Sequence, residues 1–353
     1  MPMNMIGSST LRTKISFFLL FVSLTVSFPR CARNVKSRTV KFCSAVSTAK
    51  LIEAASQEDL QRVSQMLSFI EPTTGVIVKL VGAMHYNPTS VNLAYRTCND
   101  LAESSRLGSV VVESCNQRWE KTLKSQPEGS LLRKVFDNEM QAASEVATRY
   151  GLPVILGDQD IAITNKRMGQ TFKQSIVDLV TPWKGGWRNL YEDVKLASSA
   201  TLPSGNEFLG PKDFLSASLL ALTPISLFRY LSAFVVKAPV FGIPVVLALF
   251  LSSGYASDSS PGILLEPTLL DNVQEVLTSA SIFVLETTVF ARVFLISLLA
   301  ERNDILAANI LSECQRIRKQ EGAEKASQKV VVAILGMAHC NGILNILSPS
   351  IEK

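Results

Sequence analysis

The sequence predicts an α/β fold with a mostly parallel sheet, and three observations lead to that prediction. Short apolar runs rich in β-branched residues recur along the chain, amphipathic helical stretches separate them, and glycines follow the helices. Runs with little polar alternation are typical of strands that are buried on both faces. The order strand, helix, strand, helix, strand is the pattern of right-handed βαβ units.

Four apolar runs predict the strands. Each is short, and each is followed by glycine, glutamate or both within a few residues, as expected where a buried strand ends in a turn. The four runs are Ile77–Val81, Val110–Val112, Pro153–Leu156 and Val330–Leu335.

Two stretches between these runs predict helices. Apolar residues recur at helical spacing over Ser90–Leu107, and Gly108 is placed as the C-terminal stop. The stretch Leu131–Tyr150 repeats this design and ends at Gly151. We therefore expect two βαβ units in the first half of the chain.

Residues 1–50 are expected to form a targeting leader. They contain eight Lys or Arg, no acidic residue, and many Ser and Thr, which is the composition of an organelle transit peptide. The uncharged run Ile15–Phe28 resembles the core of a secretory signal but is too short for a comfortable membrane span. Phe42–Ala45 suits plastid processing. We expect import into the chloroplast, with the mitochondrion and the secretory pathway as alternatives.

The rest of the chain shows no composition typical of nucleic-acid binding. Residues 51–353 hold 27 Lys and Arg against 30 Asp and Glu, so the formal charge of +5 belongs to the leader. We expect no nucleic-acid partner. The six cysteines show no CxxC spacing, which excludes a zinc finger and favours free thiols. No nucleotide-binding motif is seen.

The ends of the predicted strands carry the residues best suited to chemistry. Ligands of open parallel sheets bind beyond the carboxyl ends of the strands. In this chain those ends deliver two imidazoles and two carboxylates, from His85, Glu113, Asp158 and His339.

An internal repeat adds weight to the two histidines. Val78–Asn87 reads VKLVGAMHYN and Val332–Asn341 reads VAILGMAHCN, so both follow the pattern G-x-x-H-x-N after an apolar strand. One such histidine is usually structural, but the two copies use both histidines of the chain. Histidine suits metal ligation and proton transfer near neutral pH. The repeat therefore predicts a functional pair, His85 and His339, with Gly82 and Gly336 as the motif glycines.

Five motifs in this order resemble the TraB/PrgY/GumN family and the related Tiki proteins. They are GAMH, VVVESCNQR, the stretch Asn138–Arg167, LLAERNDILA and VVVAILGMAHCNGI, and they cover residues from about 75 to 345. The resemblance implies an α/β fold shared with the erythromycin-esterase and ChaN-like groups. It also implies a site that gathers the paired GxxH motifs with acidic residues, as in the metal-dependent peptidases that Tiki members resemble.

Carried over by motif, the resemblance implies a metal site and a catalytic group. The implied metal ligands, for Mn²⁺, Co²⁺ or Zn²⁺, are His85, His339, Asp158 and Glu301. The implied catalytic residues are Glu113, Glu139, Arg118, Arg167 and Arg302. Glu113 or Glu139 would serve as general base and the arginines would stabilise an oxyanion.

Each of these side chains also has a structural interpretation. Glu139 and Arg302 lie in helical sequence and would pair with each other, and Asp158 would cap the following turn. Two motifs depart from the family pattern. The usual GDRP reads GDQD here, with Gln159 and Asp160, and the usual ERD ends in Asn303. These changes bear on substrate handling and activity.

A hydrophobic insertion interrupts the predicted domain. Phe214–Ser257 has only two charges, and Ala238–Ser257 has none over 20 residues, which is long enough to cross a bilayer. With Phe214–Phe228 as its other arm, a hairpin would keep both GxxH motifs on one side of the membrane. The alternative is a soluble helical subdomain. Ser281–Ala300 is expected to be a core helix.

The cluster Thr181–Arg188 mixes two tryptophans with basic residues just before this insertion. An anchor at a membrane interface and an ordinary surface loop both fit its composition.

These features divide the chain into four parts. They are the leader 1–50, the N-terminal half of the TraB-like domain 51–200, the hydrophobic insertion 201–280, and the C-terminal half 281–353. Two functions are expected: a membrane-associated, metal-dependent hydrolase, peptidase-like, acting on a peptide or small molecule, or a non-catalytic tethering or adaptor protein that keeps the fold.

Overall fold

The computed structural model describes most of the region in which the five motifs lie. The described residues are 63–201, 208–237, 277, 284 and 286–348. The predicted leader and the uncharged stretch Ala238–Ser257 lie outside them. Contacts divide the chain into two units, Met1–Val40 with Ala238–Ala291, and Lys41–Lys237 with Arg292–Lys353. All that follows concerns the second unit.

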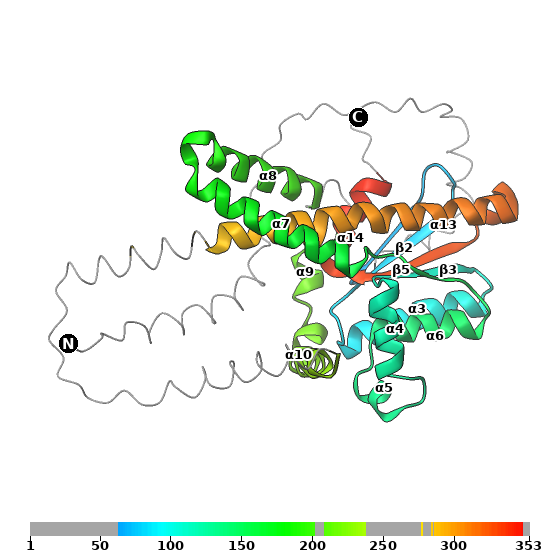
Figure 1. The fold of residues 1–353 in the computed structure, drawn as a ribbon. Coiled ribbons are helices and arrows are strands. Elements are labelled where there is room, and N and C mark those ends of the chain that lie inside the picture. Colours follow the sequence, from blue (N-terminus) through cyan, green and yellow to red (C-terminus); the bar gives the residue numbers. More distant parts are fainter. Residues whose placement is uncertain (1–62, 202–207, 238–276, 278–283, 285, 349–353) are drawn as a thin grey trace, which may run out of the picture. The chain divides into compact units, whose positions relative to one another are not determined.

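The α/β class is confirmed, with a five-stranded, mostly parallel sheet in the order β1-β2-β5-β3-β4 (Figure 1). Strands β2, β5, β3 and β4 are parallel, and they correspond to the four predicted runs. Their bounds are Ile77–Ala83 for β2, Leu107–Val112 for β3, Val154–Leu156 for β4 and Val330–Gly336 for β5.

The strand β1 (Met66–Ile70) was not predicted. It pairs antiparallel with β2 at the edge of the sheet, where Phe69 lies opposite Val78. Its sequence, MLSFI, is short and mixes buried with half-buried positions. Such a segment carries too little periodicity to be distinguished from a loop in the sequence.

Two predicted helix bounds differ from the structure. The helix α3 (Pro88–Glu103) ends before Leu107, and Gly108 lies within β3 rather than at a helix stop. The predicted helix Leu131–Tyr150 is two helices, α5 (Leu131–Val135) and α6 (Glu139–Arg149). It breaks because Asn138 adopts an extended backbone and accepts a hydrogen bond from the Gln141 amide, 2.9 Å, which begins a new helix.

Helices cover both faces of the sheet. Alternate strand residues contact α3 and α6 on one face, and the helices α13 (Glu301–Ala326) and α14 (Met337–Leu347) on the other. A seven-residue π-helix, Phe294–Ala300, immediately precedes α13. The short helix α4 (Asn116–Ser125) follows β3. Four cysteines of the described part are free and buried, as expected.

The chain that follows β4 is helical where it is described, up to Lys237. It consists of α7 (Ile161–Val180), the 3₁₀ turn Pro182–Lys184, α8 (Gly186–Thr201), α9 (Pro211–Phe214) and α10 (Ala217–Lys237). Among the described residues, no helix has the length and apolar character that a membrane span needs.

Candidate functional site at the carboxyl edge of the sheet

The two GxxH motifs lie side by side. Strands β2 and β5 are neighbours, and Ala83 pairs in register with Gly336. His85 follows β2 in the loop that leads to α3, and His339 lies in the first turn of α14. The parallel pairing therefore brings the two repeats of the sequence to one point of the sheet edge.

A buried carboxylate orients His85. Glu139, the first residue of α6, is fully buried, and its Oε1 accepts a hydrogen bond from His85 Nδ1 at 2.6 Å. Its Oε2 accepts from the Tyr86 amide at 3.1 Å. Burial works against the charged imidazole, but Glu139 and then Glu113 outweigh it and raise the pKa of His85 to about 9. Because Nδ1 is bonded to Glu139, Nε2 is the ring nitrogen of His85 that remains for another partner, and it lies near Gly336.

His339 is held in a similar way by a neutral residue. Its Nδ1 donates to Asn303 Oδ1 at 2.6 Å, and its Nε2 lies 3.3 Å from Glu113 Oε1. Both His339 and Asn303 are buried. When Nδ1 carries the proton, the neutral ring presents its Nε2 lone pair to the site.

The space beside Gly336 is where these groups converge. A Cβ atom built on Gly336 would lie 3.3 Å from Glu113 Oε2, 3.4 Å from His85 Nε2 and 3.8 Å from His339 Cδ2. The Gly336 amide also donates to Glu113 Oε2 at 2.6 Å. Because glycine has no side chain, the space between both imidazoles and one carboxylate stays open.

Arg302 lies behind this space and connects two carboxylates. Its Nη2 donates to Glu113 Oε1 at 2.5 Å and to Asp158 Oδ2 at 2.8 Å, and its Nε donates to Asp158 Oδ1 at 2.8 Å. Arg118 also pairs with Asp158, and it donates to the Glu113 carbonyl at 2.8 Å. All of these charges except that of Arg118 are buried.

The network keeps Glu113 and Arg302 charged. Burial alone would raise the pKa of Glu113, but His339, Arg302 and His85 outweigh it and hold that pKa well below its ordinary value. Burial likewise disfavours the Arg302 guanidinium, and the Glu113 and Asp158 carboxylates reverse this and raise its pKa. Glu113 and Arg302 therefore form a buried pair of opposite charges at this edge.

The remaining predicted residues lie apart or pair differently. Arg167 and Glu301 form a more exposed ion pair with each other, bonded through Arg167 Nε at 3.1 Å to both carboxylate oxygens. The structural interpretations of Glu139 and Arg302 do not hold, because Glu139 pairs with His85 while Arg302 pairs with Glu113 and Asp158. The cap of α7 is Asp160, which accepts from the Ala162 amide, and not Asp158.

The asparagines of the two G-x-x-H-x-N repeats hold neighbouring segments. Asn87 caps α3 by accepting from the Thr89 amide at 3.0 Å. Asn341 accepts from the Leu209 amide at 2.8 Å and donates to the Leu209 carbonyl at 3.0 Å. They support the site without facing it.

The sequence pattern assigns no role to Asn303 beyond its departure from a motif. In the structure its amide oxygen accepts from His339 Nδ1 at 2.6 Å. The spacing of Asn303, one residue after Arg302 on α13, was the available signal.

Among the described residues, no three or more His, Cys, Asp or Glu side chains are arranged to hold a metal ion. The donor types nevertheless fit one, because two imidazoles backed by oxygen acceptors and one carboxylate surround the space beside Gly336. Asp158 and Glu301 do not face this space, since arginines take up their carboxylates.

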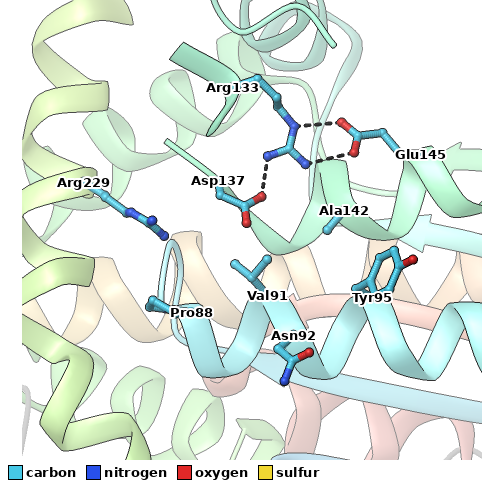
Figure 2. Close-up of a pocket in the computed structure, with 9 residues that line it drawn as sticks. All are labelled: Pro88, Val91, Asn92, Tyr95, Arg133, Asp137, Ala142, Glu145 and Arg229. Carbon is cyan, nitrogen blue, oxygen red and sulfur yellow. Dashed lines mark hydrogen bonds and ion pairs between the residues drawn. The ribbon is translucent and has the colours of Figure 1, made fainter. Parts of the chain in front are cut away.

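A separate cavity of about 370 Å³ lies beside α3, and Figure 2 shows its lining. The buried Arg133 donates through Nε to Glu145 at 2.7 Å and also pairs with Asp137. Arg229 reaches in from α10 and contacts the Tyr86 carbonyl at 3.5 Å. None of the residues predicted for the site lines this cavity. The Arg133 pairs hold α5 against α6.

Comparison with known proteins adds no assignment. No protein-family model matches the chain, and no curated protein matches it.

Proposed function

We propose that this chain is a metal-dependent hydrolase of the TraB/PrgY/GumN type, which holds a divalent transition metal through His85, His339 and Glu113. One observation carries the proposal. Both imidazoles have Nδ1 bonded to an oxygen acceptor, and both line the space beside Gly336, His85 through Nε2 and His339 through Cδ2. The Nε2 atom of His339 lies 3.3 Å from Glu113 Oε1 next to this space. A histidine that binds a metal through one ring nitrogen usually donates the other ring N–H to an oxygen acceptor of this kind.

The residues have distinct tasks in this proposal. When bound, the metal acidifies a water molecule and polarises a carbonyl. Glu139 and Asn303 fix the two rings, which keeps their donor atoms converged. Arg302 offsets the charge of Glu113 and Asp158. Arg118, about a third exposed, places a cation at the rim, where it stabilises negative charge that develops on a substrate oxygen.

The proposed substrate is a peptide or a small molecule that contains a carbonyl group, because a bound metal would polarise such a group. The metal ligands of the proposal differ from those implied by the family motifs. The proposal assigns Glu113 as a ligand and leaves out Asp158 and Glu301, because only Glu113 shares the open space with both histidines.

Metal content tests the proposal. The purified chain is stripped with a chelator, exposed to Mn²⁺, Co²⁺ or Zn²⁺, and analysed by mass spectrometry of the metal, with the Co²⁺ absorption spectrum as a second readout. We expect about one ion per chain, with tetrahedral Co²⁺ bands. The ion is lost in His85→Ala and in His339→Ala.

A matched pair of glycine variants shows whether the space itself matters. In Gly336→Ala the new methyl group occupies the space between the three donors, and metal binding falls. The backbone of Gly336, with φ of −61°, tolerates alanine. Gly169→Ala is the control, because nothing lies within 4 Å of its added Cβ. Equal metal content in the wild type and all four variants would contradict the proposal.

A second function is favoured by a different observation. Glu113, Glu139 and Asp158 are each already paired with arginine or histidine, as in a purely structural network. A non-catalytic tethering or adaptor protein would use such a network to stabilise the fold. A wild-type chain that binds no metal, and hydrolyses no ester or peptide in a broad fluorogenic panel, would select this function.

A further inference from the structure

The turn between α7 and α8 displays two tryptophans to solvent. Trp183 is 76% exposed and Trp187 is 61% exposed, and Tyr191, one helical turn after Trp187, is 64% exposed. Large aromatic side chains seldom remain so exposed on a folded domain unless they contact a partner. The surface is part of a helical hairpin that Figure 1 shows as α7 and α8.

The facing helix extends this apolar surface. Phe172, Ile176 and Val180 follow one another at intervals of one turn along α7 and are 42–60% exposed. The Trp187 indole nitrogen donates to the Leu179 carbonyl at 3.0 Å, so its ring lies across the end of α7 next to Val180. We call the six residues Phe172, Ile176, Val180, Trp183, Trp187 and Tyr191 the apolar tip.

The apolar tip is held in place and is no loose loop. Gly185 has a φ of 81°, in the left-handed region that favours glycine. A Cβ on Gly186 would lie 2.1 Å from the Asp178 carbonyl oxygen, so the two helices approach too closely for any other residue. The side chain of Asp178 is bonded by the buried Arg292 at 2.6 Å. The exposed rings thus belong to an ordered surface.

Basic residues lie on the same three elements as the apolar tip. Lys173, Lys184 and Arg188 are exposed, and none of them pairs with a carboxylate within the part of the chain that the structure describes. Two of the nearby acids, Asp178 and Asp193, are both taken up by Arg292. The surface therefore combines aromatic rings with uncompensated positive charge.

We propose that the apolar tip docks onto an anionic lipid surface, with the two indoles at the level of the headgroups. Trp and Tyr next to Lys and Arg are the residues that membrane interfaces favour. A second copy of the chain is a poorer occupant, because a symmetric contact would bring the same positive charges together. The inference is independent of the hydrolase proposal.

Fluorescence of the full chain with lipid vesicles tests this docking. The chain has three tryptophans, and Trp119 is half-buried against the hydrophobic core. In Trp119→Phe all indole fluorescence comes from the apolar tip. With vesicles that contain phosphatidylglycerol we expect a blue shift of emission and quenching by brominated acyl chains. With pure phosphatidylcholine we expect weaker binding.

Two variants complete the experiment. Lys184→Gln with Arg188→Gln should weaken binding about fivefold for each charge removed. The control Trp183→Phe with Trp187→Phe leaves only Trp119, which should not be quenched. Vesicle binding without quenching of the tip indoles would overturn the proposal, since other segments would then hold the lipid. A blue shift that depends on protein concentration without vesicles would overturn it in favour of a second copy.

Discussion

The carboxyl edge of the sheet buries ionisable side chains, whereas the apolar tip of the α7–α8 hairpin exposes apolar ones. At the edge, the carboxyl groups of Glu113, Glu139 and Asp158 are buried, and each is paired with an arginine or a histidine. At the tip, large apolar rings are ordered but exposed. Burying a charged group costs free energy, and an exposed apolar side chain gains none from folding. Neither region is therefore explained by folding stability alone, and each indicates a function.

The largest expected effect separates buried from exposed ion pairs. Arg302→Met leaves Glu113 and Asp158 buried without their shared cation, and should reduce the free energy of unfolding by ~3–5 kcal/mol. Arg167→Met is the control. Its side chain is 48% exposed and pairs with Glu301, so its loss should cost ~0–1 kcal/mol. Urea unfolding measures both. Similar losses in the two variants would show that the edge network is as weakly coupled as a surface pair.

The edge can be predicted from the sequence because strand ends obey local rules. The four parallel strands are apolar and end near glycine or glutamate, so the sequence alone assigns His85, Glu113, Asp158 and His339 to one edge. The side-by-side position of β2 and β5 brings the two histidine repeats together. That adjacency depends on the order of strands in the sheet, which is a long-range property.

The hydrogen-bond partners within the site could not be predicted from the sequence either, because they also depend on long-range contacts. Glu139 bonds His85 across 54 positions, and Arg302 bonds Glu113 across 189. Local spacing carries no information on such contacts. Asn303 shows the difference most clearly, because the residue that looks like a lost charge in the sequence supplies the acceptor for His339. The break before Glu139, set by the capping Asn138, likewise depends on a choice between one helix and two.

The next largest expected effect is a pH dependence of folding stability that His85 causes at the carboxyl edge. The pKa of His85 is raised from 6.5 to about 9 in the folded chain, so folding favours the protonated ring. This contribution to stability is fully present below pH 6.5 and is lost as the pH rises through about 9. Because the side chain is 34% exposed, solvent screening reduces the contribution to ~1–2 kcal/mol.

Unfolding of the metal-free wild type and of His85→Gln between pH 6 and 10 measures this contribution. The stability difference between the two should shrink between about pH 6.5 and pH 9 and stay constant above that. A difference that is constant with pH would show that His85 does not carry the extra proton. Metal binding should strengthen over the same interval, since the metal competes with that proton.

The smallest expected effect concerns the apolar tip. Trp183→Ala removes a side chain that is 76% exposed, with no hydrogen bond among the described residues, and should change the free energy of unfolding by no more than ~0.5 kcal/mol. Trp187→Ala is the comparison, because it also loses the bond to the Leu179 carbonyl and should cost ~0.5–1.5 kcal/mol. Thermal unfolding of the purified chain without lipid measures both. A large loss in Trp183→Ala would mean that the ring is buried by the chain itself, which would leave no free indole for a membrane. A near-zero change, together with loss of vesicle binding, would place the role of this ring outside folding.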